Sequence, residues 1–266
     1  MFKLIIHYSC RCYLLLLLIA GASPVMAQTT PRQNLVMTSS FEGADYLSGW
    51  YNNQHCCNWS VQQSSQQVKA GSTSLRLEVR STDAATSGSI RSEINLDSDP
   101  LNEVRWYGFS LFLKDWVDDD AGETVFQWAP DNASGSSSMS LLASGGRFVF
   151  TTNDGGSNSN NIYTDIGAVS SNKWIDFVIK IKWATDTTGL LQVWMNGNLV
   201  ISRTSVKTTA VTSYFKAGIN KFGWTTQGST VTQRVLYLDE VRVGNANATY
   251  SDVAPFLPRR DYFRGQ

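Results

Sequence analysis

Residues 74–80 read Ser-Leu-Arg-Leu-Glu-Val-Arg, with apolar and polar side chains alternating at every step. Successive side chains of an extended strand point to opposite faces, so the two leucines and the valine share one face and the charged residues share the other. This alternation predicts a β-strand with one face buried and one face in water.

The same alternation recurs along most of the chain, separated by turn residues. Asn196-Gly197 is the strongest of these hairpin signals, and glycine-rich turns also lie at 144–146 and 153–156. The predicted strands are Gly88–Leu96, Val104–Leu113, Thr124–Trp128, Ser138–Ala143, Arg147–Thr152, Trp174–Trp183, Leu190–Met195, Leu199–Ser202, Tyr214–Asn220 and Arg234–Val243. So many short strands without intervening helices indicate an all-β, two-sheet sandwich of jelly-roll type, in which one sheet carries a concave groove.

The N-terminal residues have the pattern of an export signal. A basic start at Lys3 and Arg11 precedes the apolar stretch 13–20, and Val25-Met26-Ala27 is a small-residue cleavage site. We therefore expect a signal peptide over 1–27, a single domain over 28–266, and a secreted or periplasmic protein. No later segment has the roughly 18 apolar residues of a membrane span.

The charge balance does not suggest nucleic acid or an anionic membrane as a partner. The chain has 22 Lys+Arg and 22 Asp+Glu, and its aromatic content is 12%. Exposed aromatic rings can stack on the apolar faces of sugars, although most of the nine Trp can equally fill a β-core. We expect a monomer that binds a carbohydrate.

Cys56 and Cys57 are the only cysteines after the predicted cleavage site. Adjacent cysteines cannot join distant segments. In an oxidising compartment they form a vicinal disulfide or remain small buried thiols.

Three predicted strands place polar residues on one face. Arg91, Glu93 and Asn95 alternate with apolar neighbours in the first of them, and Gln127 does so in the second. The third is Tyr214–Asn220, in which Tyr214, Lys216 and Asn220 share a face. Any half-exposed strand shows this alternation, but cations, amides and a phenol together suit an anionic, hydroxyl-rich ligand.

The motifs Arg91-Ser92-Glu93-Ile94, Gln127-Trp128-Ala129 and Tyr214-Phe215-Lys216-Ala217-Gly218-Ile219-Asn220 occur in this order. Together they resemble the three-strand signature of jelly-roll polysaccharide lyases of the alginate lyase and heparin lyase I type. The resemblance extends through Tyr107–Ser110, Trp194–Gly197 and Tyr237–Val241.

The resemblance implies cleavage of a uronate polysaccharide, of ulvan, glucuronan or alginate type, by β-elimination without a required cofactor. Arg91 and Gln127 would hold and neutralise the uronate carboxylate, and Lys216 would add positive charge. Glu93, Asn220, Trp194 and Tyr237 complete the expected substrate-binding set.

Two positions depart from the family pattern. Ala129 stands where the family has His, and Asn220 stands where it has Tyr, and those two residues usually act as base and acid. Neither replacement transfers a proton at ordinary pH. The candidate catalytic residues are therefore Lys216, Tyr214 and the loop histidine His55.

Further proton-transfer candidates are the phenols of Tyr163 and Tyr237 and the amine of Lys221. The changes at Ala129 and Asn220 leave a second reading open, a non-catalytic carbohydrate-binding module. A third reading is a hydrolase of the same fold, for which Glu93 and Glu123 would have to flank one bond.

Asp118-Asp119-Asp120 followed by Glu123 could bind a structural calcium ion, since hard oxygen ligands gather there. A solvated acidic loop is the alternative for the same residues.

Overall fold

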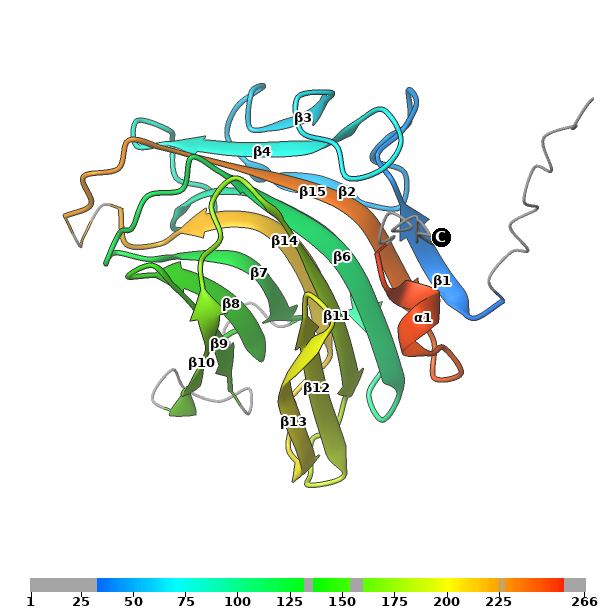
Figure 1. Ribbon diagram of the computed structural model, residues 1–266. Helices are drawn as coiled ribbons and strands as arrows, with labels where there is room; N and C mark the ends of the chain where they lie inside the picture. The colour runs from blue at the N-terminus through cyan, green and yellow to red at the C-terminus, as the bar shows by residue number, and fades with distance from the viewer. Residues whose placement is uncertain (1–32, 132–135, 154–159, 225, 227, 256–266) are drawn as a thin grey trace, which may run out of the picture. The chain divides into compact units, whose positions relative to one another are not determined.

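The computed structural model describes residues 33–131, 136–153, 160–224, 226 and 228–255, and the predicted signal peptide lies outside them. These residues form two antiparallel sheets and one helical turn, α1 (Tyr250–Val253), as Figure 1 shows. The predicted all-β sandwich is confirmed. Among the described residues, no helix has the length and hydropathy needed to cross a bilayer.

One sheet, here called the back sheet, includes β1 (Leu35–Ser39), which pairs with β15. Its other strands, in spatial order, are β13 (Asn198–Val206), β12 (Gly189–Met195), β11 (Trp174–Lys182), β6 (Val104–Lys114), β15 (Gln233–Gly244), β4 (Ser74–Arg80) and β3 (Val61–Ser64).

The other sheet, here called the front sheet, has seven strands. In spatial order they are β10 (Ile162–Ala168), β9 (Arg147–Thr152), β8 (Met139–Ser144), β7 (Glu123–Pro130), β14 (Ser213–Lys221), β5 (Ile90–Asp99) and β2 (Tyr51–His55).

The core between the sheets is built largely from aromatic rings. Phe215 of β14 packs 5.2 Å from both Phe109 of β6 and Trp128 of β7, measured between ring centroids. Phe126 of β7 also lies 5.0 Å from Phe109. All four side chains are almost fully buried. Exposing any one of these aromatic side chains, as rotation of its strand would do, would cost several kcal/mol of folding free energy. The opposite faces of β7 and β14 therefore point away from the core.

Four strands are absent from the sequence prediction, namely β1, β2, β3 and β10. Three of them, β2, β3 and β10, are the outermost strands of their sheets, and β1 pairs only with β15. Edge strands bury less of either face, so β2 (Tyr-Asn-Asn-Gln-His) and β3 (Val-Gln-Gln-Ser) carry no regular apolar alternation.

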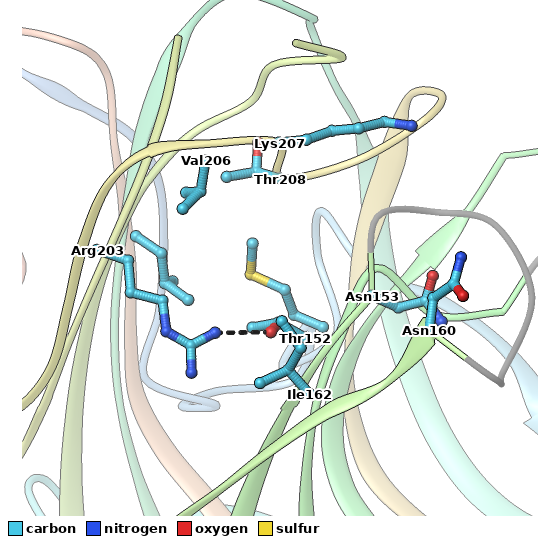
Figure 2. A pocket seen from close by; sticks show the side chains of 10 residues that line it. Thr152, Asn153, Asn160, Ile162, Arg203, Val206, Lys207 and Thr208 are labelled. Atoms are coloured by element: carbon cyan, nitrogen blue, oxygen red, sulfur yellow. Dashed lines mark hydrogen bonds between the residues drawn. The ribbon is translucent and has the colours of Figure 1, made fainter. Parts of the chain in front are cut away.

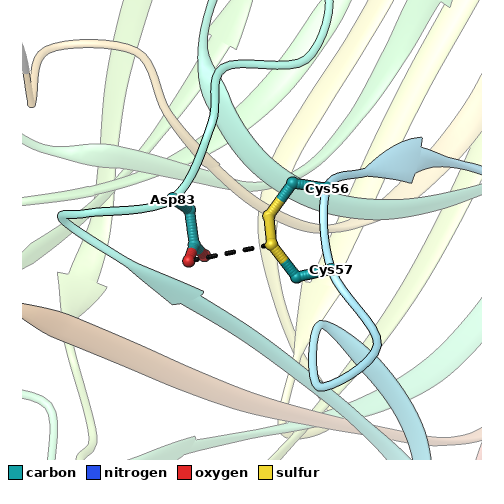
Figure 3. A group of neighbouring side chains, drawn as sticks. All are labelled: Cys56, Cys57 and Asp83. Atoms are coloured by element: carbon teal, nitrogen blue, oxygen red, sulfur yellow. Dashed lines mark hydrogen bonds between the residues drawn. A yellow bond between two sulfur atoms is a disulfide. The ribbon is translucent and has the colours of Figure 1, made fainter.

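Cys56 and Cys57 form a vicinal disulfide immediately after β2 (Figure 3). The Cys57 Sγ atom lies 4.0 Å from Oδ1 of Asp83, which belongs to the turn after β4. These three residues are the one grouping of potential metal ligands within the described ranges. Because the two sulfur atoms are bonded to each other, they are not available as thiolate ligands.

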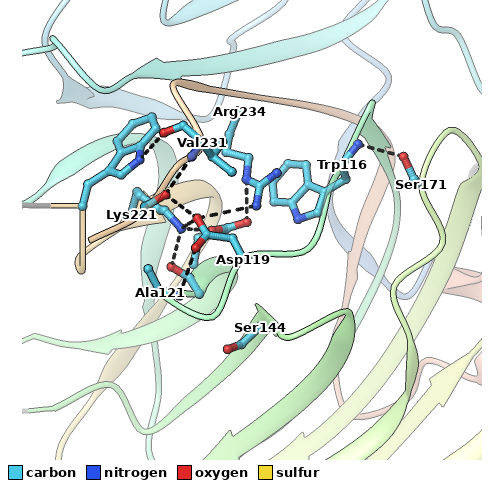
Figure 4. A network of polar contacts seen from close by, with 12 residues as sticks. Trp116, Asp119, Ala121, Ser144, Ser171, Lys221, Val231 and Arg234 are labelled. Atoms are coloured by element: carbon cyan, nitrogen blue, oxygen red, sulfur yellow. Dashed lines mark hydrogen bonds and ion pairs between the residues drawn. The ribbon is translucent and has the colours of Figure 1, made fainter. Parts of the chain in front are cut away.

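A buried ion network joins the end of β14 to the loop before β7 (Figure 4). Nζ of Lys221 lies 2.6 Å from Asp119 and 2.5 Å from Glu123. Arg234 of β15 pairs with Glu123 at 2.8 Å and stacks on the Trp116 ring at 4.5 Å. The four charged side chains balance one another, and Lys221 and Glu123 are fully buried.

This network corrects the calcium expectation for the acidic loop. Oxygen atoms of Asp119 and Glu123, which would have to ligate the ion, contact the ammonium of Lys221 and the guanidinium of Arg234. Burial raises the pKa of Glu123, while the two neighbouring cations oppose that rise. Here the protein's own cations neutralise the carboxylates.

Replacing Lys221 by methionine should lower the free energy of unfolding by about 3–5 kcal/mol, because Asp119 and Glu123 would remain buried without their shared partner. Urea unfolding at neutral pH measures the change. The matched control is Lys173→Met at an exposed position, which should cost less than about 0.5 kcal/mol. Equal effects of the two substitutions would contradict the stabilising role of the network.

Candidate functional site

The outward face of the front sheet carries one row of residues that crosses all seven strands. Strand pairing places each member directly opposite the next, so their side chains share a face. From β2 to β10 the row reads Tyr51, Asn95, Lys216, Gln127, Ser140, Thr151 and Tyr163. At about 4.8 Å between strands, the row is roughly 29 Å long.

A compact polar cluster lies beside the middle of this row. Glu93 is fully buried at its centre. Its Oε2 lies 2.8 Å from Nζ of Lys216 and 3.3 Å from Arg91, and its Oε1 accepts a 2.6 Å hydrogen bond from Nε2 of Gln127. The structure therefore brings together Arg91, Glu93, Gln127 and Lys216, which come from three different strands.

Gly218 lets the backbone of β14 approach that of β5 beside this cluster. It is opposite Glu93 in the β14–β5 pair and has a φ of +133°, a region that side chains rarely adopt. A Cβ atom at this position would lie 2.1 Å from the carbonyl oxygen of Ser92. Glycine is thus required where β14 passes closest to β5.

Arg91 and Asn220 meet at the far end of the cluster. They are opposite each other in the β14–β5 pair, and Ser89 links them by donating a 2.6 Å hydrogen bond to Oδ1 of Asn220 while accepting one from Arg91. Asn220 therefore helps to position the guanidinium.

Tyr214 is opposite Ala129 in the β14–β7 pair and faces outward, half-buried. Burial raises the pKa of its phenol above the ordinary value, and the negative charges of Glu93 and Asp131 raise it further. The phenol is therefore protonated at neutral pH, which suits a proton donor.

A hollow of about 360 Å³ lies on the same face, toward β8, β9 and β10. It is lined by Thr124, Gln127, Ser137, Ser140, Leu142, Thr151, Asn161, Tyr163, Asn220 and Phe222. Its volume is within the range of ligand-binding clefts, and it adjoins the polar cluster through Gln127 and Asn220. Ser140 and Thr151 were not singled out by the sequence, although strand alternation places them on this face.

His55 is not brought to the cluster. It is opposite Ser92 in the β2–β5 pair, whereas Gln54 is opposite Glu93. The register thus places His55 on the inward face, at the edge of the front sheet, where its Nδ1 is buried and has no hydrogen-bond partner within the described part of the chain.

Trp194, Tyr237 and Lys221 are also separated from the cluster. Trp194 stacks on Trp106 of the back sheet and packs against Tyr250 of α1. Tyr237 is fully buried in the back sheet, where its hydroxyl donates to Gln66. Lys221 lies on the inward face in the ion network. The structure therefore places none of these three residues in the cluster. Trp194 and Tyr237 pack in or on the back sheet, and Lys221 forms ion pairs.

A second hollow, of about 180 Å³, opens at the edge of the sandwich between the two sheets (Figure 2). Arg203 of β13 crosses this gap and donates hydrogen bonds to Thr152 of β9, at 2.9 Å, and Thr164 of β10, at 2.7 Å. Its guanidinium therefore ties the edges of the two sheets together. This hollow opens on the other side of the front sheet from the polar cluster.

Comparison with known proteins places this architecture in a family. The sequence model of a family described as polysaccharide lyase matches residues 42–242. The chain belongs to the polysaccharide lyase family. A search of curated proteins finds no match.

Solved structures show the same fold at low sequence identity. An endo-β-1,4-glucuronan lyase from the fungus Trichoderma reesei superposes with a TM-score of 0.64 at 22% identity, covering 79% of this chain and 98% of that one. A family 7 alginate lyase in complex with substrate gives 0.55 at 17% identity, covering 76% and 95%.

A botulinum neurotoxin type C structure gives a TM-score of 0.58 at 14% identity and covers 84% of this chain and 50% of that one. A shared fold of this kind does not determine activity, which has to be argued from the site.

The charge balance of the cluster yields a testable expectation for Glu93→Gln. This substitution leaves Arg91 and Lys216 side by side without their shared carboxylate, so the free energy of unfolding should fall by about 3 kcal/mol. A bound anion would replace the missing charge, so glucuronate should raise the melting temperature of the variant more than that of the wild type.

Differential scanning fluorimetry with and without glucuronate measures both effects. Glu103→Gln is the control, because Glu103 is half-exposed and its pair with Arg105 should contribute less than about 1 kcal/mol. Identical glucuronate shifts in Glu93→Gln and the wild type would contradict an anion site here.

Proposed function

We propose that the protein is a polysaccharide lyase that cleaves a uronate-containing polysaccharide by β-elimination. The observation that carries the proposal is the cluster of Arg91, Gln127 and Lys216 around Glu93 on the outward face of the front sheet, where Lys216 and Gln127 are 3% and 6% exposed. Family membership and the glucuronan and alginate lyase neighbours support the same class of reaction.

The chemistry requires a neutralised carboxylate. Removing the proton from C5 of a uronate builds negative charge on the carboxylate, and positive groups placed there stabilise the enolate-like intermediate. Arg91 and Lys216 supply two positive charges against the one negative charge of Glu93. One positive charge therefore remains in excess, which matches one substrate carboxylate.

We assign the two proton transfers to Lys216 and Tyr214. Lys216 passes its proton to Glu93, 2.8 Å away, and the resulting amine takes the C5 proton. The C4–O4 bond breaks as the C4–C5 double bond forms, and the protonated phenol of Tyr214 donates to O4. Proton return from Glu93 to Tyr214 restores the starting state. His55 has no part in this scheme, because it faces inward.

The alternative is a non-catalytic binding module, which the replacements at Ala129 and Asn220 would favour. Absorbance near 235 nm separates the two, since only elimination produces an unsaturated uronate. Incubation with glucuronan, alginate and ulvan should give a rise. Binding of any of these polymers without a rise in the wild type would establish the module instead.

Substitutions at Lys216 distinguish a base from a fixed positive charge. Lys216→Arg keeps the charge but cannot lose its proton, so it should reduce kcat at least about 100-fold, as Lys216→Met should. Recovery of wild-type activity in Lys216→Arg would show that only charge is needed. Tyr214→Phe should reduce kcat by a similar factor with little change in folding stability.

We also propose export with removal of residues 1–27, from the basic, apolar and small-residue pattern of the N-terminal sequence. N-terminal sequencing of the protein recovered outside the cytoplasm of an expressing bacterium should begin at Gln28. A mature chain that begins with Met1 would reject this proposal.

A further inference from the structure

We infer that the outward face of the front sheet takes a uronate flanked by neutral sugars, so that the preferred substrate is a mixed polysaccharide rather than a continuous polyuronate. The inference rests on the proposed lyase function and deepens it by naming the neighbours of the reacting uronate. Its observations come from the sections of the row on either side of the polar cluster.

Positive charge is confined to the middle of the row. Lys216 is the one cation among the seven row residues, and Arg91 stands beside it on the same face. Beyond Gln127, the next three strands present Ser140, Thr151 and Tyr163, all of them uncharged. A polyuronate lying along the row would carry a carboxylate at each of these positions without a cation opposite it.

The hollow on this side is uncharged throughout its described lining. All ten lining residues are hydroxyl, amide or apolar, and no cation among them could pair with a second uronate. Burying an unpaired carboxylate there would be costly, whereas sugar hydroxyls can exchange hydrogen bonds with Ser140 and Asn161. Leu142 and Phe222 offer apolar surface to the C–H face of a sugar ring.

The opposite side of the cluster also disfavours a second carboxylate. Tyr51 ends the row on β2, and its hydroxyl donates a 2.7 Å hydrogen bond to Oδ1 of Asp97. Asp97 is exposed and negatively charged, so it repels a uronate placed next to it. The single charged subsite thus has uncharged or acidic surroundings on both sides.

Thr151 supplies a hydroxyl that the protein itself leaves unused. Its Oγ1 is buried without a hydrogen-bond partner among the described residues, while the residue lines the hollow. An unpaired buried hydroxyl costs roughly 1–3 kcal/mol. A sugar hydroxyl in the hollow would supply the partner that Oγ1 lacks.

The test compares two polymers by initial absorbance rate near 235 nm. Glucuronan is a continuous polyuronate, and desulfated ulvan has uronates separated by neutral sugars. The wild type should show a kcat/KM at least about tenfold higher on desulfated ulvan. Equal values, or a preference for glucuronan, would overturn the inference and leave the lyase proposal standing.

Tyr163→Lys tests the charge argument directly, because Tyr163 is 61% exposed and tolerates substitution. The added cation should raise kcat/KM on glucuronan and shrink the preference at least threefold. Ile162→Lys is the matched control, since Ile162 is the adjacent residue of the same strand, is 57% exposed and faces the other way. An equal shift in the control would overturn the inference.

Thr151→Val is nearly isosteric and removes no hydrogen bond seen in the fold. It should lower kcat/KM on desulfated ulvan about tenfold without lowering the melting temperature, while Thr38→Val on β1 should change neither. An unchanged kcat/KM in Thr151→Val would overturn the inference that a neutral sugar binds at Thr151.

If absorbance does not change on any polymer, the lyase proposal is rejected, but the inference about neighbouring sugars can still be tested by binding. Calorimetric titration with oligosaccharides of the two polymers then decides, with tighter binding of the mixed oligosaccharide expected. Equal or tighter binding of the glucuronan oligosaccharide would overturn the inference.

Discussion

The packing of Phe215 in the core determines which residues of β14 point outward, and the rest of the site depends on that orientation. Its ring lies within 6.4 Å of five other aromatic rings of the core, measured between centroids. Side chains in a strand alternate with a period of two, so burying Phe215 forces Tyr214 and Lys216 outward. A slip of one residue would place an ammonium in the aromatic core. The set of residues on the outward face of β14 is thus fixed by hydrophobic packing on the other side of the same strand.

The two charge clusters on β14 differ in their net charge. Around Lys221 two cations balance two carboxylates, so the buried network is neutral and has no charge left for a ligand. Around Lys216 two cations share one carboxylate, and the cluster borders an open hollow. The lysines are five residues apart, and the odd separation places them on opposite faces of the strand.

The alternating core strands were predictable because each buries one face completely, and the same alternation located Arg91, Gln127 and Lys216 correctly on one surface. The edge strands β2 and β3 were not predictable from periodicity, since β2 (Tyr-Asn-Asn-Gln-His) has no aliphatic residue and β3 (Val-Gln-Gln-Ser) has only one. The orientation of His55 depends on the register of β2, which a short polar strand does not encode. Trp194 and Tyr237 were misplaced for a related reason: a motif gives a residue's strand, but not which sheet borders the groove.

The replacements at Ala129 and Asn220 acquire a physical meaning from their partners in the sheet. Ala129 is directly opposite Tyr214, so a small side chain leaves space beside the phenol. Asn220 is directly opposite Arg91, and its amide oxygen is engaged by Ser89, which also contacts the guanidinium. Ala129 therefore leaves room beside the phenol of Tyr214, and Asn220 helps to orient the guanidinium of Arg91. Under the proposed lyase function, these two positions leave Arg91 oriented toward a substrate carboxylate and Tyr214 free to donate a proton, so both proton transfers fall to residues of β14.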